Sequence, residues 1–146
     1  MEKKDLKPAG VFKYFEEICQ VPRPSKKEEK MIAYLKVFGA KHNLETKVDE
    51  AGNVLIKKPA TPGKENLQTV VLQSHIDMVC EKNNDVQHDF LTDPIETEID
   101  GEWLKAKGTT LGADNGIGVA TELAILADDS IEHGPLECLF TVDEET

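Results

Sequence analysis

Apolar residues recur with helical spacing near the start of the chain. Between residues 8 and 19 they stand at positions i, i+1, i+4 and i+7, namely Val11, Phe12, Phe15 and Ile18. This spacing places the four side chains on one face and predicts an amphipathic helix. Pro8 suits its first turn. The segment 21–24, which contains two prolines, is expected to end it.

A second helix is predicted from Ser25 to about His42. Its buried face would hold Met31, Ile32, Leu35 and Phe38. Glu28 stands three residues after Ser25, which is the pattern of a capping box. In that motif the serine and glutamate side chains satisfy backbone N–H groups at the helix start. We therefore expect the helix to begin at Ser25.

Short apolar runs further along the chain predict β-strands separated by turn residues. The expected strands are 47–48, 53–56, 69–74, 95–99, 102–106 and 136–142. Two of them flank Asp100-Gly101, a favoured two-residue hairpin turn. The longer runs 69–74 and 136–142 are typical of buried strands.

Residues 80–94 are polar and aperiodic and predict a long loop. A last helix is expected at 117–126, with Ile117, Ala120, Ala124 and Ile125 on its inner face. Helices first, and then strands alternating with a helix, indicate an α/β fold. We expect a mixed, mainly parallel sheet flanked by helices on both faces.

Length and charge narrow the class of protein. A chain of 146 residues is one domain by the usual expectation and is long enough for a real core. Seventeen basic and 28 acidic residues give a net charge of −11, which opposes binding to nucleic acid or to an anionic membrane. Three widely spaced cysteines, no signal peptide and no membrane-spanning run favour a cytoplasmic protein.

One histidine and several carboxylates stand where predicted elements begin or end. The first two follow a strand and are two positions apart, so an extended backbone points them to the same side. The third precedes the last helix, and the final two follow the last strand. These five residues are His75, Asp77, Asp114, Glu144 and Glu145. Because sites in open α/β sheets lie beyond the carboxyl ends of strands, we expect them to converge.

Such a set suits hydrolysis at two metal ions. Histidine nitrogen and carboxylate oxygen are zinc ligands, and one aspartate can bridge paired metals. Of two adjacent glutamates, one can bind metal while the other takes a proton from water. Taken singly, each residue also has an ordinary alternative: a structural histidine, a helix-capping aspartate or a solvated glutamate pair. The glycine-rich segment with glycines at 112, 116 and 118 lacks the Lys-Ser/Thr pair of a nucleotide-binding loop, so it does not predict nucleotide binding.

Several segments resemble the aminoacyl-histidine dipeptidases. These are the bacterial carnosinase-like branch of the dizinc aminopeptidase and aminoacylase superfamily. The resemblance lies in residues 72–79, 88–90, 100–103, 108–118, 133–137 and 143–145. Its most specific part is the run Gly-Thr-Thr-Leu-Gly-Ala-Asp-Asn-Gly-Ile-Gly at 108–118.

The resemblance implies a role for each of the five residues. His75 would bind one zinc ion, and Asp77 would orient His75. Asp114 would bridge both zinc ions, Glu145 would bind the other zinc, and Glu144 would be the general base. The implied activity is hydrolysis of Xaa-His and related dipeptides by metal-activated water, with two zinc ions in the intact site, or other divalent metals such as Co²⁺ or Mn²⁺.

The resemblance also implies that residues 1–146 are the N-terminal portion of the metallopeptidase catalytic domain. The remaining part would supply a further carboxylate ligand, a final histidine ligand, and a lid and dimerisation domain, which are absent from these residues. We therefore expect the intact protein to be a homodimer and the fragment alone to be inactive. Two alternatives stay open: a non-catalytic metal- or partner-binding module, and a related tripeptidase or deacylase.

Overall fold

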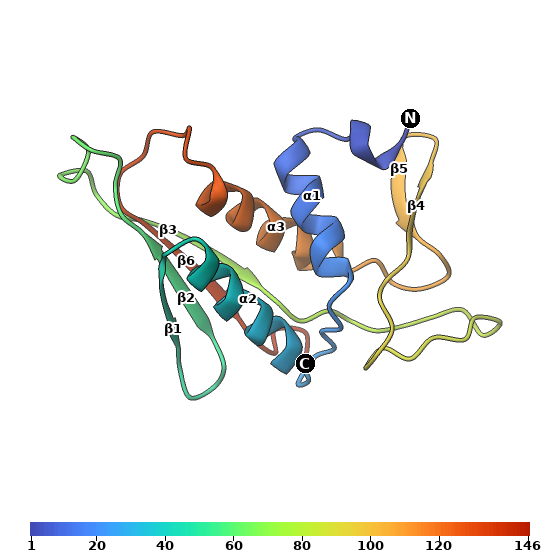
Figure 1. Cartoon of the computed structure of the whole chain (residues 1–146). Helices are drawn as coiled ribbons and strands as arrows, with labels where there is room; N and C mark the ends of the chain where they lie inside the picture. Colours follow the sequence, from blue (N-terminus) through green and yellow to red (C-terminus); the bar gives the residue numbers. More distant parts are fainter.

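Three helices, six strands and a short 3₁₀ turn make up this computed structural model, which describes all 146 residues (Figure 1). In chain order the elements are η1 (Lys3–Asp5), α1 (Ala9–Cys19), α2 (Glu29–Lys41), β1 (Glu45–Val48), β2 (Val54–Lys58), β3 (Val70–His75), β4 (Thr97–Asp100), β5 (Trp103–Ala106), α3 (Ala113–Ala127) and β6 (Leu136–Thr141). All the predicted helices and strands are present, with shifted ends. None of the three helices combines the length and apolar character that a membrane crossing needs.

Four strands form one sheet in the order β1-β2-β6-β3, and β4 and β5 form a separate hairpin. The predicted α/β class with a mixed sheet is confirmed. The expectation of a mainly parallel sheet is wrong for these strands, because only the β3–β6 pair is parallel. A tight turn joins β1 to β2 and makes them antiparallel, whereas β3 reaches β6 through the crossover that contains α3.

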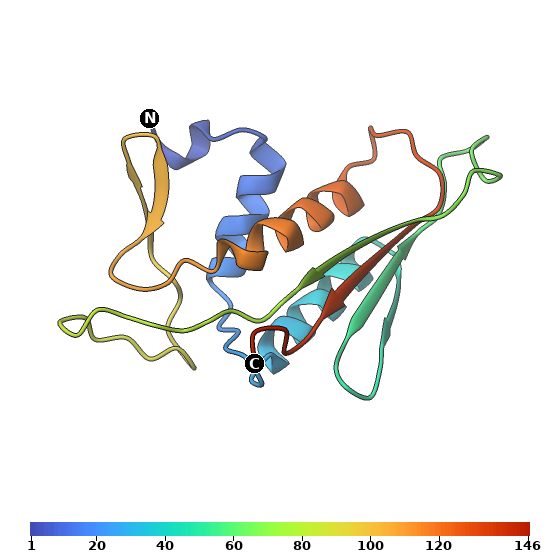
Figure 2. The ribbon, with the colours of Figure 1, turned by 180° about the vertical axis from the view of Figure 1, so that it is seen from behind.

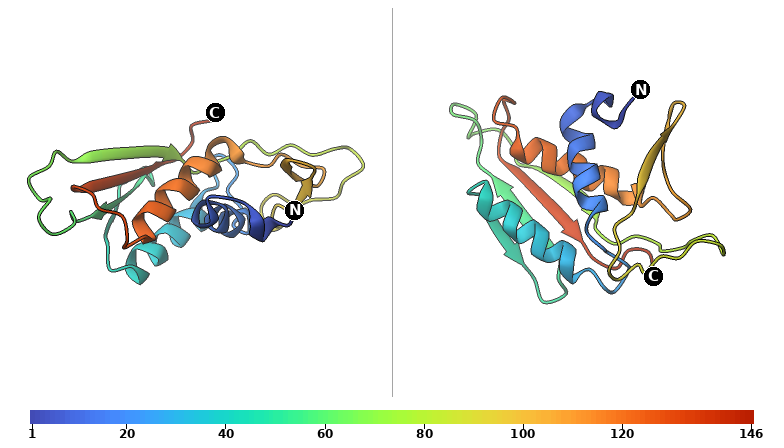
Figure 3. Two further views of the ribbon diagram at one scale, coloured as in Figure 1. Left: turned by 90° about the horizontal axis from the view of Figure 1, so that it is seen from above. Right: turned by 45° about the vertical axis from the view of Figure 1, so that its right-hand side comes forward.

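Helices α2 and α3 cover one face of the sheet, as the views from behind and above show (Figures 2 and 3), and α1 packs against α3. Ile56 of β2 pairs with Cys138 of β6, and both side chains are fully buried beneath the helices. The neighbouring pair, Leu55 and Leu139, points to the opposite face and is half-buried. The prediction that helices flank both faces is therefore wrong within these residues.

The strand that leads to the candidate site lies at an edge of the sheet. β3 pairs only with β6, so Val70 and Val71 are 51% and 56% exposed. Only the end of β3, at Ser74 and His75, is buried. The apolar run was a sound indication of a strand, but strand composition does not distinguish an edge position from a central one.

Helix α3 buries Ala120 as predicted, but the rest of its inner face differs from the predicted one. Its inner residues are Gly116, Val119, Ala120, Glu122, Leu123 and Leu126, whereas Ile117 is 39% exposed. The helix packs against both α1 and β3, so its contact face is set by two partners. In the β4–β5 hairpin, Asp100 pairs with Trp103, so the turn is centred on Gly101 and Glu102, one residue later than predicted.

The capping box predicted at the start of α2 is also wrong. The helix begins at Glu29, with no side-chain cap. The Ser25 hydroxyl instead donates to Asp77, and the Glu28 carboxylate accepts the N–H of Asp143. Both side chains therefore bind the segments that carry the candidate site. The tertiary structure offered these groups acceptors and donors that a local motif could not reveal.

Candidate metal centre

The five predicted residues meet at one end of the sheet. His75 is the last residue of β3 and pairs with Thr141, the last residue of β6. Because the two strands are parallel, their carboxyl ends lie together, and the segment after β6 returns beside His75. Helix α3 begins at the same end. Three segments that are distant in sequence thus supply one cluster of side chains.

The three predicted metal ligands lie close together. Nε2 of His75 is 3.0 Å from Oδ1 of Asp114 and 3.8 Å from Oε1 of Glu145. One donor atom from each residue lies within 4.8 Å of the other two. The His75 side chain is 7% exposed, whereas Asp114 is 85% exposed. The cluster therefore has a buried base and an open, acidic rim.

This donor set fits a divalent transition metal. One imidazole nitrogen and two carboxylate oxygens are the mixture that zinc accepts. Ligand atoms about 2 Å from a tetrahedral zinc ion are roughly 3.3 Å apart, close to the observed spacing between His75 and its two carboxylate neighbours. The residues present are therefore compatible with one metal ion held at this cluster.

Asp77 lies beneath the cluster and is fully buried. Its Oδ1 is 3.2 Å from Nδ1 of His75. In the neutral tautomer with Nδ1 protonated and donating to Asp77, Nε2 would present its lone pair to a metal ion at the cluster, as a metal ligand requires. The position of Asp77 is therefore compatible with the predicted orienting role, which stays a prediction.

Asp77 also holds the backbone of the two glutamates. Its carboxylate accepts the N–H of Glu144 and that of Glu145, each over 3.1 Å, and the hydroxyl of Ser25 over 2.7 Å. Burial acts to raise the pKa of Asp77, but these hydrogen bonds stabilise the carboxylate and bring the pKa below its usual value. A single buried anion therefore fixes both His75 and the segment 144–145.

The pKa of His75 is raised above its usual value. Burial acts to lower it, but the hydrogen bond to Asp114, the hydrogen bond to the Asp77 backbone and the charges of Asp77 and Glu144 outweigh burial. The ring therefore lies in a strongly negative environment, which is also attractive to a cation.

Asp114 does not cap a helix. The N-cap of α3 is Gly112, with φ of 79°, and the side chain that caps the helix where it resumes is that of Asn115, whose Oδ1 accepts the N–H of Gly118 over 3.1 Å. The backbone of Asp114 is extended, with φ of −94° and ψ of 104°, and it interrupts the first turn. The side chain is thereby free to reach His75. The alternative of an ordinary helix cap does not apply to this residue.

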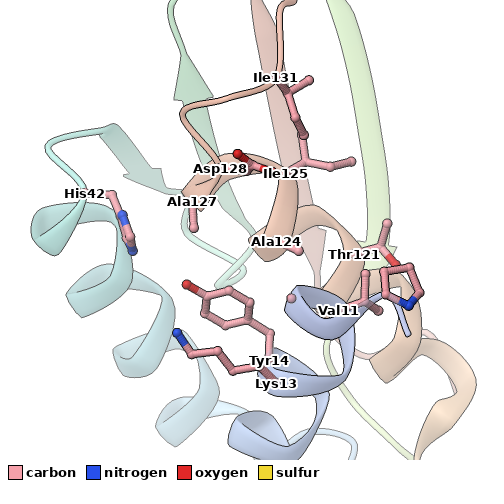
Figure 4. Close-up of a pocket in the computed structure, with 12 residues that line it drawn as sticks. Val11, Lys13, Tyr14, His42, Thr121, Ala124, Ile125, Ala127, Asp128 and Ile131 are labelled. Carbon is pink, nitrogen blue, oxygen red and sulfur yellow. The ribbon is translucent and has the colours of Figure 1, made fainter. Parts of the chain in front are cut away.

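Two hollows can be compared as binding sites. One, of about 390 Å³, borders the cluster through Asp114 and Glu145 and is otherwise lined mainly by residues 110–113. A larger one, of about 520 Å³, lies between α1 and the C-terminal half of α3, beside Lys13, Tyr14 and Ile125 (Figure 4). None of the clustered candidate ligands borders the larger hollow, so the smaller one is the candidate substrate space.

Sequence reasoning missed two residues that support the site. Ser25 was assigned to a helix cap, and Arg23 received no role. Arg23 is the only arginine among the 17 basic residues and is almost completely buried. The available signal was that the one arginine of a lysine-rich chain stands between two prolines. Which acceptors satisfy a buried guanidinium is decided by the fold and could not be predicted from that signal.

Known proteins resemble this chain over nearly its whole length. The cytosol non-specific dipeptidase of Escherichia coli strain K12 is 52% identical over 144 residues, covering 99% of this chain and 30% of that protein. The crystal structure of the aminoacylhistidine dipeptidase of Vibrio alginolyticus is 54% identical with a TM-score of 0.96, covering 100% of this chain and 30% of that one. A Staphylococcus aureus tripeptidase structure, 23% identical, shares the fold with a TM-score of 0.75, covering 93% of this chain and 36% of that one. No protein-family model matches.

The chain therefore spans about a third of the length of these relatives. The resemblance to aminoacyl-histidine dipeptidases that was predicted from the sequence is confirmed, and it concerns the N-terminal part of those proteins. Over this part the fold matches that of the Vibrio alginolyticus structure with a TM-score of 0.96.

Proposed function

We propose that the intact protein is a zinc-dependent dipeptidase that acts on Xaa-His and related dipeptides. The observation that carries the proposal is the convergence of His75, Asp114 and Glu145 into one donor cluster. The 54% identity to an aminoacylhistidine dipeptidase supports the substrate class. The proposal includes residues 1–146 as the N-terminal portion of the catalytic domain, with a lid and dimerisation domain outside them, in a cytoplasmic homodimer.

The residues divide the work according to their positions. His75, Asp114 and Glu145 would hold metal, with Asp114 shared between two ions. Zinc at this place would supply Lewis-acid activation of a water molecule and of the peptide carbonyl. Asp77 keeps the His75 ring in the orientation and tautomer that present Nε2 to the cluster.

The two glutamates differ in exposure and position, and these differences support the roles that we propose for them. Glu145 is 23% exposed, and one of its oxygens belongs to the donor cluster. Glu144 is 57% exposed, and its Oε2 lies 3.9 Å from Nε2 of His75. Glu144 therefore faces the same space without completing the donor set. We assign it as the general base that takes a proton from the attacking water and returns it to the leaving amine.

The test compares the two glutamates in the full-length protein. Zinc content and release of histidine from Ala-His are measured for the wild type, Glu144→Gln and Glu145→Gln. The Glu144→Gln variant should keep zinc and lose activity by about 10²- to 10⁴-fold. The Glu145→Gln variant should lose both zinc and activity. Glu132→Gln, at an exposed position, should match the wild type.

Two results would contradict the proposal. The first is a zinc-loaded wild type that releases no histidine. If that protein cleaves tripeptides or N-acyl amino acids instead, it is a related tripeptidase or deacylase. If it binds zinc and cleaves none of these, it is a metal-binding module. The second is full activity in Glu144→Gln, which would remove Glu144 from the mechanism.

A further inference from the structure

Arg23 lies between the segments that carry the candidate ligands. It follows α1, between Pro22 and Pro24, and the whole residue is 2% exposed. The main chain of this segment also contacts the region after β3, because the N–H of Met78 donates to the carbonyl of Arg23 over 3.0 Å. The backbone of Arg23 is therefore held in place by a hydrogen bond to the segment that follows His75.

The guanidinium joins two separate segments through backbone carbonyls. Nη1 donates to the carbonyl of Ile76 over 3.0 Å and to that of Asp77 over 3.3 Å. Nη2 donates to the carbonyl of Gly112 over 2.7 Å. The first two carbonyls follow His75, and the third lies just before Asp114. One side chain thus spans the distance between two of the proposed metal ligands.

One of these carbonyls also contacts the proposed ligand ring. The carbonyl oxygen of Asp77 lies 3.1 Å from Nδ1 of His75 and also accepts from Arg23. A shift of this peptide group would change the angle of the His75 ring. Arg23 therefore contacts the imidazole ring of His75 through a single backbone group, the carbonyl of Asp77.

Two glycines of the specific sequence run make room for the guanidinium. A Cβ atom on Gly112 would lie 2.6 Å from Nη2 of Arg23, and a Cβ on Gly116 would lie 2.7 Å from the same atom. Heavy atoms do not approach this closely without displacement. Gly112 and Gly116 therefore leave the space that the buried guanidinium of Arg23 occupies.

The contacts require arginine in particular. Its planar guanidinium presents donors in several fixed directions, whereas lysine offers one compact ammonium. Burial lowers the pKa of Arg23 from its ordinary value, and the charge of Asp77 acts in the opposite direction. The residue keeps its charge in the core because carbonyl oxygens on two segments accept its hydrogen bonds.

We propose that Arg23 is a positioning residue that sets the placement of His75 relative to Asp114 through the carbonyls of Asp77 and Gly112. This inference rests on the proposed metallopeptidase function for its consequences in catalysis. The effect of Arg23 on the position of the His75 ring is testable in the metal-free protein.

The chain offers a matched control in Lys58. This cation is also buried, and its Nζ donates to the carbonyls of Ile125 over 3.2 Å and Asp128 over 2.9 Å. It ties β2 to the C-terminal end of α3, away from the candidate site. Lys58→Met therefore removes a buried cation with carbonyl acceptors but leaves the site untouched.

The experiment compares Arg23→Met, Arg23→Lys and Lys58→Met in the full-length protein. Without metal, the ¹⁵N resonances of the His75 ring should shift in Arg23→Met and stay unchanged in Lys58→Met. With Co²⁺, the visible spectrum of Arg23→Met should change and its Kd should rise about 10- to 100-fold. The kcat for Ala-His should fall about 10- to 100-fold with KM within about threefold. Arg23→Lys should give intermediate values, and Lys58→Met should match the wild type.

A folded Arg23→Met variant with wild-type His75 resonances, Co²⁺ spectrum and kcat would overturn the proposal. If Arg23→Met fails to fold, Arg23→Lys decides in the same way, and wild-type values in that variant overturn it. Failure of the proposed function is recognised separately. A wild type that hydrolyses no dipeptide contradicts the function, while the metal-free His75 resonances still decide whether Arg23 positions the ring.

Discussion

The hydroxyl of Ser25 donates a 2.7 Å hydrogen bond to Oδ2 of Asp77, a carboxylate with no exposed surface. The connection between the first two helices thus contributes directly to the support of the candidate metal centre. Asp77 gathers this hydroxyl, two backbone N–H groups and the His75 ring around one charge. Removal of any of these donors is therefore expected to act on both stability and metal affinity.

Ser25→Ala should lower the free energy of unfolding by about 1–3 kcal/mol, because a buried carboxylate loses a donor. Zinc affinity should fall about 10-fold, since Asp77 orients a ligand. Urea unfolding and zinc titration measure the two effects. Ser130→Ala is the control, because its hydroxyl donates to the carboxylate of Asp128 in a solvent-exposed hydrogen bond. Equal losses in both variants would contradict a special role for the buried bond.

Gly112→Ala should destabilise the protein more than Gly63→Ala. Both glycines have positive φ, 79° and 90°, so both substitutions strain the backbone by about 1–2 kcal/mol. A Cβ on Gly112 would also lie 2.6 Å from Arg23 and 2.8 Å from Met78. A Cβ on Gly63 would have no atom within 4 Å apart from those of the adjacent residues. Thermal unfolding should show a further loss of about 1–3 kcal/mol at Gly112. Equal melting temperatures would mean that the packing around Arg23 yields easily.

Glu122 should make stability depend on pH between about 4.5 and about 7. Burial raises the pKa of its carboxyl from 4.5 to about 7, and its buried Oε2 has no hydrogen-bond partner. The folded protein therefore holds a proton that the unfolded chain releases. The contribution of Glu122 to stability is most favourable below pH 4.5 and declines as pH rises through about 7.

Glu122→Gln should remove this decline. At pH 8 the variant should be more stable than the wild type by up to roughly 3 kcal/mol, from 1.36 kcal/mol per pKa unit. At pH 4.5 the two should be similar. Urea unfolding at pH 4.5, 6 and 8 measures the difference, and Glu132→Gln at an exposed position should show none. A stability difference that does not change with pH would contradict the assignment.

Zinc should stabilise the folded protein through the cluster at His75. A ligand that binds only the folded state adds about 2.7 kcal/mol at 100 times its Kd. Thermal unfolding with and without zinc measures this increment. His75→Ala should reduce it, because one zinc ion loses its nitrogen donor in the cluster. His133→Ala, which alters a histidine hydrogen-bonded to the Gly134 carbonyl, should retain it. An undiminished zinc response in His75→Ala would place the metal elsewhere.

Local patterns were sufficient to locate the helices and strands. The spacing of Val11, Phe15 and Ile18 is a property of neighbouring residues, and α1 lies where it predicts. The same holds for the turn between β1 and β2. The errors concern contacts with distant segments. Periodicity alone could not show that α3 packs on both α1 and β3, or that β3 lies at an edge.

The sequence by itself determined which residue types were available for chemistry and where they stood relative to strands and helices. It named His75, Asp77, Asp114 and the two glutamates, and the resemblance supplied their proposed roles. Only the tertiary structure decided that these side chains meet, because His75 and Asp114 are 39 positions apart in the sequence.

The tertiary structure also decided what supports the cluster. Ser25 had a plausible local use as a helix cap, and Arg23 had none. Each found its partners on segments more than 50 positions away. A buried charge must be satisfied by whichever groups the fold brings within hydrogen-bond distance. Sequence spacing therefore predicted the elements and the candidate ligands, whereas long-range hydrogen bonding fixed their geometry.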